Sequence, residues 1–211
     1  IGVPLKRLSR PSLSRGKNAV SDFIPVARIA DMLLNPGQPY SFNGNQSHYP
    51  DIRLVYWCGG NPFHHPQDLN RLREAWKQPE TIIVHEPWWT ATAKYSDIVL
   101  PATTPYERED IARAATDAFL FHMPELISPV DDARDDYEIF SELATRLHID
   151  EVYTEGRDAD AWLRYLYQGF KRDSADQGVD LPDYDSLRAS NWVELPISGA
   201  EHARIPFEHF R

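Results

Sequence analysis

Polar side chains follow three short apolar runs of the sequence, and the first group could form a ligand-binding loop. Gly59, Gly60 and Asn61 come directly after the first run. Paired glycines let a ligand approach the backbone, and an amide side chain both donates and accepts hydrogen bonds. His64 and His65 follow a few residues later. The pattern fits a binding loop, although Gly-Gly-Asn-Pro by itself is also an ordinary turn signal.

Ionisable side chains follow the second and third apolar runs. His85 and Glu86 end the second run, at the place where dinucleotide-binding folds carry an acidic acceptor for ribose hydroxyls. The third run is followed by four polar residues, Thr103, Thr104, Glu107 and Arg108. The arginine fork suits a phosphate or a guanine edge. A surface ion pair between Glu86 and Arg108 is the plainer explanation of the same two residues.

Metal and nucleophilic chemistry have weaker support in the sequence. Cys58 is the only cysteine, so a disulfide, an iron–sulfur cluster or a cysteine-rich zinc site within the chain is excluded. Three histidines, His64, His65 and His85, could suggest zinc, but adjacent histidines point apart. The serines lie mainly in connecting segments, and no nucleophile elbow is present. We therefore expect this chain to bind a ligand, with no metal ligand and no catalytic residue of its own.

The elements that must position these groups follow from the apolar patterns. The runs at 52–57, 81–85 and 97–100 predict buried strands. A helix capped by Asp68 separates the first two runs, and this succession predicts a right-handed crossover between parallel strands. Ligands bind where parallel strands end, because loops and helix N-termini meet there. We predict an α/β fold with a doubly wound, mainly parallel sheet flanked by helices, similar to a Rossmann domain.

Four further segments have helical patterns. Apolar residues recur at helical spacing after Pro25, and a short helix is predicted at 90–95. Asp135 and Glu138 resemble a capping box before an apolar stripe. Asp136 either shares that capping or faces a ligand. A last helix is predicted at about 158–170.

The domain organisation predicted from the sequence has three parts. Residues 1–23 form a linker from a preceding domain, 24–184 form the α/β cofactor-binding domain, and 185–211 lead toward a next domain. Both ends have the character of cuts in a longer protein. The aromatic tail at 205–210 is expected to pack on a neighbouring domain, and a weaker alternative is a protein-interaction surface.

Composition narrows the possible partners. The net charge of −10 disfavours the phosphate attraction on which nucleic-acid binding depends. No stretch approaches the roughly 20 apolar residues that span a bilayer. We expect no nucleic-acid partner and no transmembrane segment, and composition leaves the compartment open.

Four long motifs in order resemble one known family. They are IPVARIADMLLNPG, VYWCGGNPFHHPQDLNRL, TIIVHEPWWTATAKYSDIVLPATTPYERED and ARDDYEIFSELATRL, which together span about 24–147. This series is similar to the dimethyl sulfoxide reductase family of molybdenum enzymes, in particular its S-oxide and N-oxide reductase branch.

The resemblance implies the third domain of such an enzyme, which holds the guanosine end of one of two molybdopterin guanine dinucleotides. The implied cofactor contacts are Asn61, His65, His85, Glu86, Arg108 and Asp136. Asp136 resembles the acidic partner of the guanine edge. Only His65 is carried over from the histidine pair, because His64 and Pro66 depart from the pattern of many relatives.

The resemblance further implies a parent oxidoreductase that transfers oxygen atoms with bis-molybdopterin guanine dinucleotide and molybdenum. Its substrate is expected to be a small S-oxide or N-oxide, although oxidation by the same cofactor stays open. The amino-acid ligand of molybdenum lies in a different domain, so this chain alone is expected to be inactive and to depend on the other domains of its parent. The alternative from the residues alone is a stand-alone α/β module that binds a nucleotide without redox chemistry.

Overall fold

The structure is a computed structural model that describes residues 11–13, 17, 20, 23–114 and 118–195 of the chain. The chain divides into two compact units. Unit 2 consists of Arg15–Thr103 and Val130–Asp136. Unit 1 consists of Ile1–Ser14, Thr104–Pro129 and Tyr137–Arg211. Each unit has its own hydrophobic cluster.

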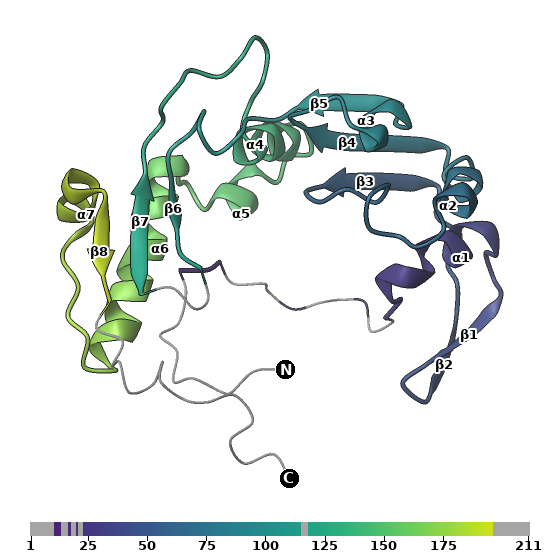
Figure 1. Cartoon of the computed structure of the whole chain (residues 1–211), viewed down its shortest axis with the longest axis horizontal. Coiled ribbons are helices and arrows are strands. Elements are labelled where there is room, and N and C mark those ends of the chain that lie inside the picture. Colours follow the sequence, from purple (N-terminus) through teal and green to yellow (C-terminus); the bar gives the residue numbers. More distant parts are fainter. Residues whose placement is uncertain (1–10, 14–16, 18–19, 21–22, 115–117, 196–211) are drawn as a thin grey trace. The chain divides into compact units, whose positions relative to one another are not determined.

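A three-stranded parallel sheet forms the centre of unit 2. Its strands are β3 (Leu54–Cys58), β4 (Thr81–Glu86) and β5 (Ile98–Pro101), in the order β3-β4-β5 (Figure 1). The register pairs Cys58 with His85 and His85 with Leu100. The parallel α/β arrangement predicted from the apolar runs is confirmed. Within the described residues the strand order runs one way only, so the doubly wound, Rossmann-like form stays a prediction.

Short helices connect and cover these strands. The 3₁₀ turn η1 (Val26–Arg28) leads into α1 (Ile29–Leu34), and α2 (Leu69–Ala75) and α3 (Ala91–Lys94) precede β4 and β5. The caps are side chains of the expected kind: Asp68 accepts from the backbone N–H of Arg71, and Thr90 accepts from that of Ala93. The helices predicted after 25, after 68 and at 90–95 are therefore confirmed.

The core of unit 2 lies between α1, α2 and the sheet. Its buried residues are Leu33, Phe63, Leu72, Ala75, Trp76 and Ile82. The rings of Phe63 and Trp76 meet edge to face with centroids 5.5 Å apart. Because Phe63 follows directly on the Gly-Gly-Asn-Pro sequence, this packing anchors the loop after β3 to the core.

A hairpin in unit 2 was not predicted. It consists of β1 (Pro39–Phe42) and β2 (Asn45–His48), paired antiparallel. Its turn is Asn43-Gly44, and both residues have positive φ, 50° and 80°. This dipeptide favours the two-residue hairpin turn whose twist matches the strands, so the signal was present in the sequence.

Unit 1 contains an antiparallel sheet that was also not predicted. Strands β6 (Asp110–Ala112), β7 (Phe119–Met123) and β8 (Trp192–Glu194) lie in that order. Helices α6 (Ala159–Ala175) and α7 (Tyr184–Ser190) contribute most of the core of this unit. Strands β6 and β8 have only three residues each, which offer too little periodicity to be recognised in a sequence.

The predicted helices after 135 and 158 are present in unit 1, with α5 (Asp150–Thr154) between them. Helix α4 spans Asp136–Arg146. Helix α6 begins after its cap Asp158 and continues to Ala175, beyond the predicted end at 170. The extension is explained by Ser174, which is fully buried, and by Gly178, whose φ of 80° suits the turn that follows the helix.

A carboxylate joins sheet and helix in unit 1. Glu109 accepts hydrogen bonds from His122 Nε2 at 2.9 Å, Tyr184 Oη at 3.2 Å and Arg188 Nη2 at 3.0 Å. Burial, together with the charge of Glu109, raises the pKa of the Tyr184 hydroxyl, which therefore keeps its proton. The network ties the segment before β6 to β7 and α7.

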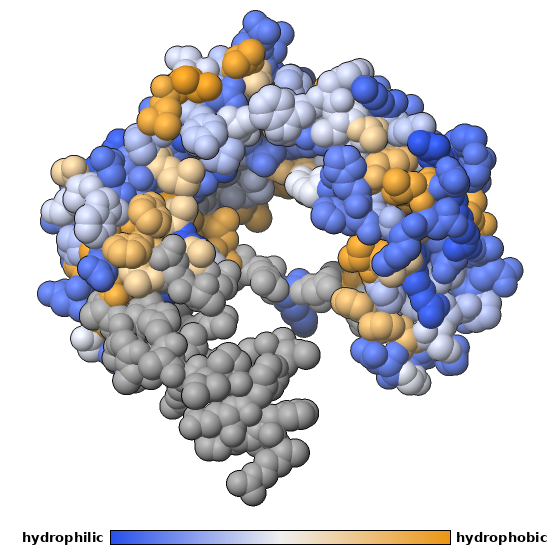
Figure 2. Space-filling view, in the orientation of Figure 1, coloured by the Kyte–Doolittle hydropathy of each residue, from blue (hydrophilic) through white to orange (hydrophobic). Residues whose placement is uncertain are grey.

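The surface of unit 1 is polar with scattered apolar exceptions. Figure 2 shows apolar side chains on the loop that follows β7, where Leu126 and Ile127 are exposed. Exposed apolar residues of this kind are normal on folded proteins, so they support no functional conclusion. Among the residues that the structure describes, no helix combines the length and apolar character needed to cross a bilayer.

The three-part domain division stays a prediction. Most of the expected linker at 1–23 and the aromatic tail at 205–210 lie outside the described residues. In the expected exit segment, the structure describes most of α7 and all of β8.

The burial of neighbouring isoleucines predicts unequal effects on stability. Ile82 in β4 is 3% exposed, whereas Ile98 in β5 is 45% exposed. Replacing Ile82 by Val should lower the free energy of unfolding by about 1 kcal/mol, because a buried methyl group is lost. The same change at Ile98 should cost about 0.5 kcal/mol or less. Chemical denaturation of both variants checks this, and equal losses would contradict the packing described for unit 2.

Candidate functional site

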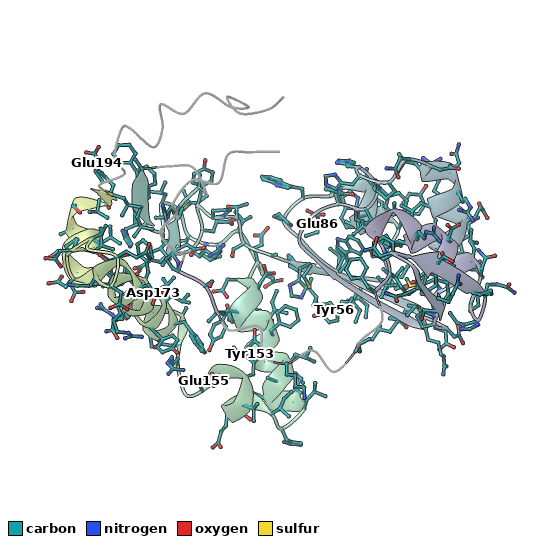
Figure 3. The ribbon with its side chains drawn as sticks, turned by 90° about the horizontal axis from the view of Figure 1, so that it is seen from below. Tyr56, Glu86, Tyr153, Glu155, Asp173 and Glu194 are labelled. Atoms are coloured by element: carbon teal, nitrogen blue, oxygen red, sulfur yellow. The ribbon has the colours of Figure 1, made fainter. Side chains whose placement is uncertain are left out.

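A cavity of about 460 Å³ lies where the three parallel strands of unit 2 end. All of its lining residues belong to unit 2. They are Gly59, Gly60, Asn61, His64, His65, His85, Glu86, Pro87, Thr90, Ala102, Thr103 and Asp136. The volume is in the range of small-molecule sites. Figure 3 labels Tyr56 and Glu86, which come from neighbouring strands and lie on the same side of unit 2.

The loop after β3 is held by two glycines and one amide. Gly59 and Gly60 have φ values of 76° and 66°, which residues with a Cβ rarely adopt. Asn61 Oδ1 accepts hydrogen bonds from the backbone N–H of Phe63 and from the hydroxyl of Thr92. These two donors fix the amide orientation, so Asn61 Nδ2 is left as a donor toward a ligand.

His85 lies buried at the end of β4 and links two other side chains. Its Nδ1 is 2.7 Å from Asp136 Oδ1, and its Nε2 is 2.9 Å from Tyr56 Oη. The side chain of His85 is 2% exposed, whereas that of Asp136 is 64% exposed. The exposed carboxylate of Asp136 at the cavity is therefore held by a hydrogen bond to the buried ring of His85.

Glu86 adds a second carboxylate at the next residue of β4. Its Oε2 accepts a hydrogen bond of 2.9 Å from Thr90 Oγ1. Among the residues that the structure describes, no lysine or arginine lines the cavity. Two carboxylates without a lysine or arginine beside them suit the hydrogen-bond donors of a ligand better than its phosphates.

The electrostatic surroundings keep two further groups near the cavity protonated. Burial raises the pKa of the Tyr56 hydroxyl, and the charge of Asp136 acts in the same direction. Desolvation and the charge of Asp136 likewise raise the pKa of the Cys58 thiol. A protonated thiol is a poor nucleophile, so the environment of Cys58 gives no support to covalent catalysis.

Five of the six predicted contact residues meet at this cavity. They are Asn61, His65, His85, Glu86 and Asp136. Arg108 lies in unit 1, where its guanidinium forms an ion pair with Asp110. The role expected for Arg108 therefore rests on the resemblance alone.

The group predicted after the third strand is divided between the two units. Thr103 lines the cavity in unit 2. Thr104 belongs to unit 1, where its backbone N–H and its hydroxyl donate to Glu107 Oε2 at 2.7 and 2.6 Å. These bonds stabilise the turn that precedes β6.

Two supporting residues, Tyr56 and Thr92, were missed. Tyr56 pairs with Ile83 in the sheet register, and His85 is two residues further along β4. Because side chains alternate along a strand, Tyr56 and His85 share one face, and that periodicity could have placed them together. No comparable pattern links Thr92 to Asn61, which are brought together only by packing.

The zinc alternative gains no support from the geometry. Both His64 and His65 line the cavity. Over the part of the chain that the structure describes, no group of three or more His, Cys, Asp or Glu residues could hold a metal ion.

Comparison with known proteins places residues 13–146 in the family "Molybdopterin oxidoreductase". A biotin sulfoxide reductase of Cereibacter sphaeroides is 47% identical over 198 residues, which cover 93% of this chain and 27% of the relative. A dimethyl sulfoxide/trimethylamine N-oxide reductase of Rhodobacter capsulatus is 44% identical over 184 residues, which cover 86% of this chain and 22% of the relative. The chain thus spans about a quarter of the length of the curated relatives it matches.

A solved structure shares the fold at low sequence identity. Acetylene hydratase from Pelobacter acetylenicus aligns with a TM-score of 0.52 and 17% identity, over 72% of this chain and 20% of the hydratase.

The Thr92 hydroxyl is predicted to stabilise the loop after β3. Replacing Thr92 by Val keeps the shape of the side chain but removes a donor to Asn61, which should cost about 1 to 2 kcal/mol locally. The backbone amide of Phe63 should then exchange with solvent about tenfold faster, as measured by hydrogen exchange. Thr92→Ser retains the hydroxyl and should leave this amide nearly as protected as in the native chain. Equal protection in the native and Val forms would refute the role of Thr92.

Proposed function

The chain belongs to the molybdopterin oxidoreductase family, and from that premise we propose that the cavity of unit 2 binds the guanosine end of a molybdopterin guanine dinucleotide. The parent protein would be a molybdenum-dependent oxidoreductase that reduces S-oxides or N-oxides. The observation that carries the proposal is the carboxylate of Asp136, which is anchored by His85 and lines a cavity without cationic side chains.

The donors and acceptors at the cavity fit guanine better than adenine. Guanine presents two neighbouring donors, N1–H and N2–H₂, to which a carboxylate can bond with both oxygens. Adenine has an acceptor at N1 beside its exocyclic donor, so one carboxylate oxygen would face a lone pair. Asn61 Nδ2 supplies a donor for an acceptor atom of the ligand, such as guanine O6. Asp136 is therefore the proposed source of base selectivity.

Glu86 and His65 complete the proposed nucleoside contacts. A carboxylate after the second strand of a parallel sheet is suited to ribose hydroxyls, which are hydrogen-bond donors. Thr90 holds one oxygen of Glu86 and leaves the other for the ligand. His65 lines the same cavity and can contribute either a donor or an acceptor.

The remaining parts of the proposal rest on the family resemblance. Arg108 is proposed to contact the dinucleotide, and the three-stranded sheet is proposed to be part of a doubly wound, Rossmann-like domain at 24–184. The flanking segments would lead to other domains of the parent chain.

The redox chemistry is assigned to the parent and not to this chain. Molybdenum, when bound with its two pterins, supplies oxygen-atom transfer to and from the substrate. The relatives named above act on biotin sulfoxide, dimethyl sulfoxide or trimethylamine N-oxide, according to their names. We propose a small S-oxide or N-oxide as the substrate of the parent. This chain would contribute cofactor binding and would be inactive alone.

Nucleotide titration of the 211-residue chain tests the proposed site. GDP added to the ¹⁵N-labelled chain should shift amide signals in the loop after β3 and around Glu86 and Asp136, and ADP should not. Asp136→Asn should weaken GDP binding by roughly 10- to 100-fold, because it removes a charge-assisted pair of hydrogen bonds worth about 1.5 to 3 kcal/mol.

The matched control is Asp132→Asn, which makes the same charge change at an exposed residue outside the cavity. Its affinity for GDP should stay within about twofold of the native value. The absence of shifts up to ~10 mM GDP, or equal shifts with ADP, would sink the guanosine assignment.

A further inference from the structure

Tyr56, His85 and Asp136 form a chain of hydrogen bonds whose far end reaches the cavity. Tyr56 comes from β3 and His85 from β4, and Asp136 is the first residue of α4. Of these three residues, Asp136 and His85 line the cavity and Tyr56 does not, so any effect of Tyr56 on the cavity passes through His85. The rings of Tyr56 and His85 meet edge to face with centroids 5.4 Å apart.

The direction of each bond follows from what its atoms can do. An ionised carboxylate only accepts hydrogen bonds, so the 2.7 Å contact to Asp136 Oδ1 requires a proton on His85 Nδ1. A neutral imidazole carries one N–H, which leaves Nε2 as an acceptor. The group 2.9 Å from Nε2 is the Tyr56 hydroxyl, which is a donor when it keeps its proton.

We propose that Tyr56 is a positioning residue: its hydroxyl donates to His85 Nε2, holds the ring as the neutral Nδ1–H tautomer, and thereby fixes the carboxylate of Asp136 toward the cavity. The consequence for guanine binding rests on the function proposed above, whereas the assignment of the His85 tautomer is independent of that function.

His85 is enclosed by groups from two other elements. Its side chain is 2% exposed. The ionisable groups named around it are Tyr56 and Cys58 from β3 and Asp136 from α4. Burial also raises the pKa of the Tyr56 hydroxyl, so that group stays a donor at neutral pH.

The bond between His85 and Asp136 matters because the side chain of Asp136 is largely exposed to solvent. Its side chain is 64% exposed, and the bond to His85 Nδ1 is the side-chain contact that holds it. With the other tautomer, a lone pair of Nδ1 would face the carboxylate oxygen and repel it. The Asp136 carboxylate and the Tyr56 hydroxyl therefore act in the same direction: the first requires a proton on Nδ1, and the second donates to Nε2 and keeps that nitrogen an acceptor.

The tautomer can be observed directly in the unmodified 211-residue chain. Long-range ¹H–¹⁵N NMR of chain labelled in its histidine rings distinguishes the Nδ1–H form, the Nε2–H form and the doubly protonated ring. The His85 signal is assigned by its loss in His85→Gln. At pH 7.5 we expect the Nδ1–H form with no nucleotide present. An Nε2–H form or a doubly protonated ring would overturn the proposal.

Removal of one hydroxyl then tests whether Tyr56 helps to hold this tautomer. Tyr56→Phe should move part of the His85 signal to the Nε2–H or doubly protonated form, because Nε2 loses its donor while Asp136 still accepts from Nδ1. Tyr95→Phe is the control, because Tyr95 lies in the same unit and its hydroxyl makes no hydrogen bond to any described residue. An unchanged His85 signal in Tyr56→Phe would refute the positioning role.

Nucleotide affinity separates this inference from the proposed function. If the positioning role of Tyr56 and the guanosine site are both correct, Tyr56→Phe weakens GDP binding about three- to tenfold. Tyr95→Phe then leaves the affinity for GDP within about twofold of the native value. If the tautomer responds to Tyr56→Phe but the native chain binds no GDP, the positioning role stands and the guanosine site fails. If Tyr56→Phe changes the His85 tautomer but binds GDP as tightly as the native chain, the claim that the His85 ring positions the carboxylate of Asp136 is wrong.

Discussion

The parallel pairing of β3, β4 and β5 is the constraint on which the cavity of unit 2 depends. In parallel strands the carboxyl ends meet at one edge, and the register sets His85 of the central strand between Cys58 and Leu100. The loops that leave this edge carry Asn61, Glu86 and Thr103 to a common place although they are separated by up to 42 residues of sequence. A one-residue slip of β4 would turn His85 to the opposite face and remove the anchor of Asp136.

The cavity also depends on buried groups that hold its more exposed side chains in place. The Thr92 hydroxyl fixes the amide of Asn61, and His85 fixes the carboxylate of Asp136 from a buried position. Buried polar groups need partners, so such residues hold one arrangement more firmly than exposed side chains could by themselves. The cavity is thus a set of exposed acceptors and donors held by buried side chains.

Some site residues could be predicted from their place at the ends of apolar runs, whereas others depend on contacts between distant parts of the sequence. Asn61, His85 and Glu86 directly follow or end apolar runs, and the rule that ligands bind at strand ends applies to them without knowledge of the packing. Asp136 required the family resemblance, because its carboxylate reaches His85 across 51 residues of sequence. Arg108 shows the opposite difficulty: its place in the motif predicted a ligand contact, whereas its observed partner is the nearby Asp110.

By itself, the sequence determined the helices that follow residues 25, 68, 90, 135 and 158, the three parallel strands and the type of chemistry at their ends, because apolar period and capping residues act over a few neighbouring positions. Only the tertiary structure decided the division into two units, the antiparallel sheet β6-β7-β8 and the pairing of Tyr56 with His85 and Asp136. The physical reason is the sequence separation of the groups that interact. The strands of the antiparallel sheet are stabilised by partners far along the chain, and a buried hydrogen bond forms only after packing has excluded water from its atoms.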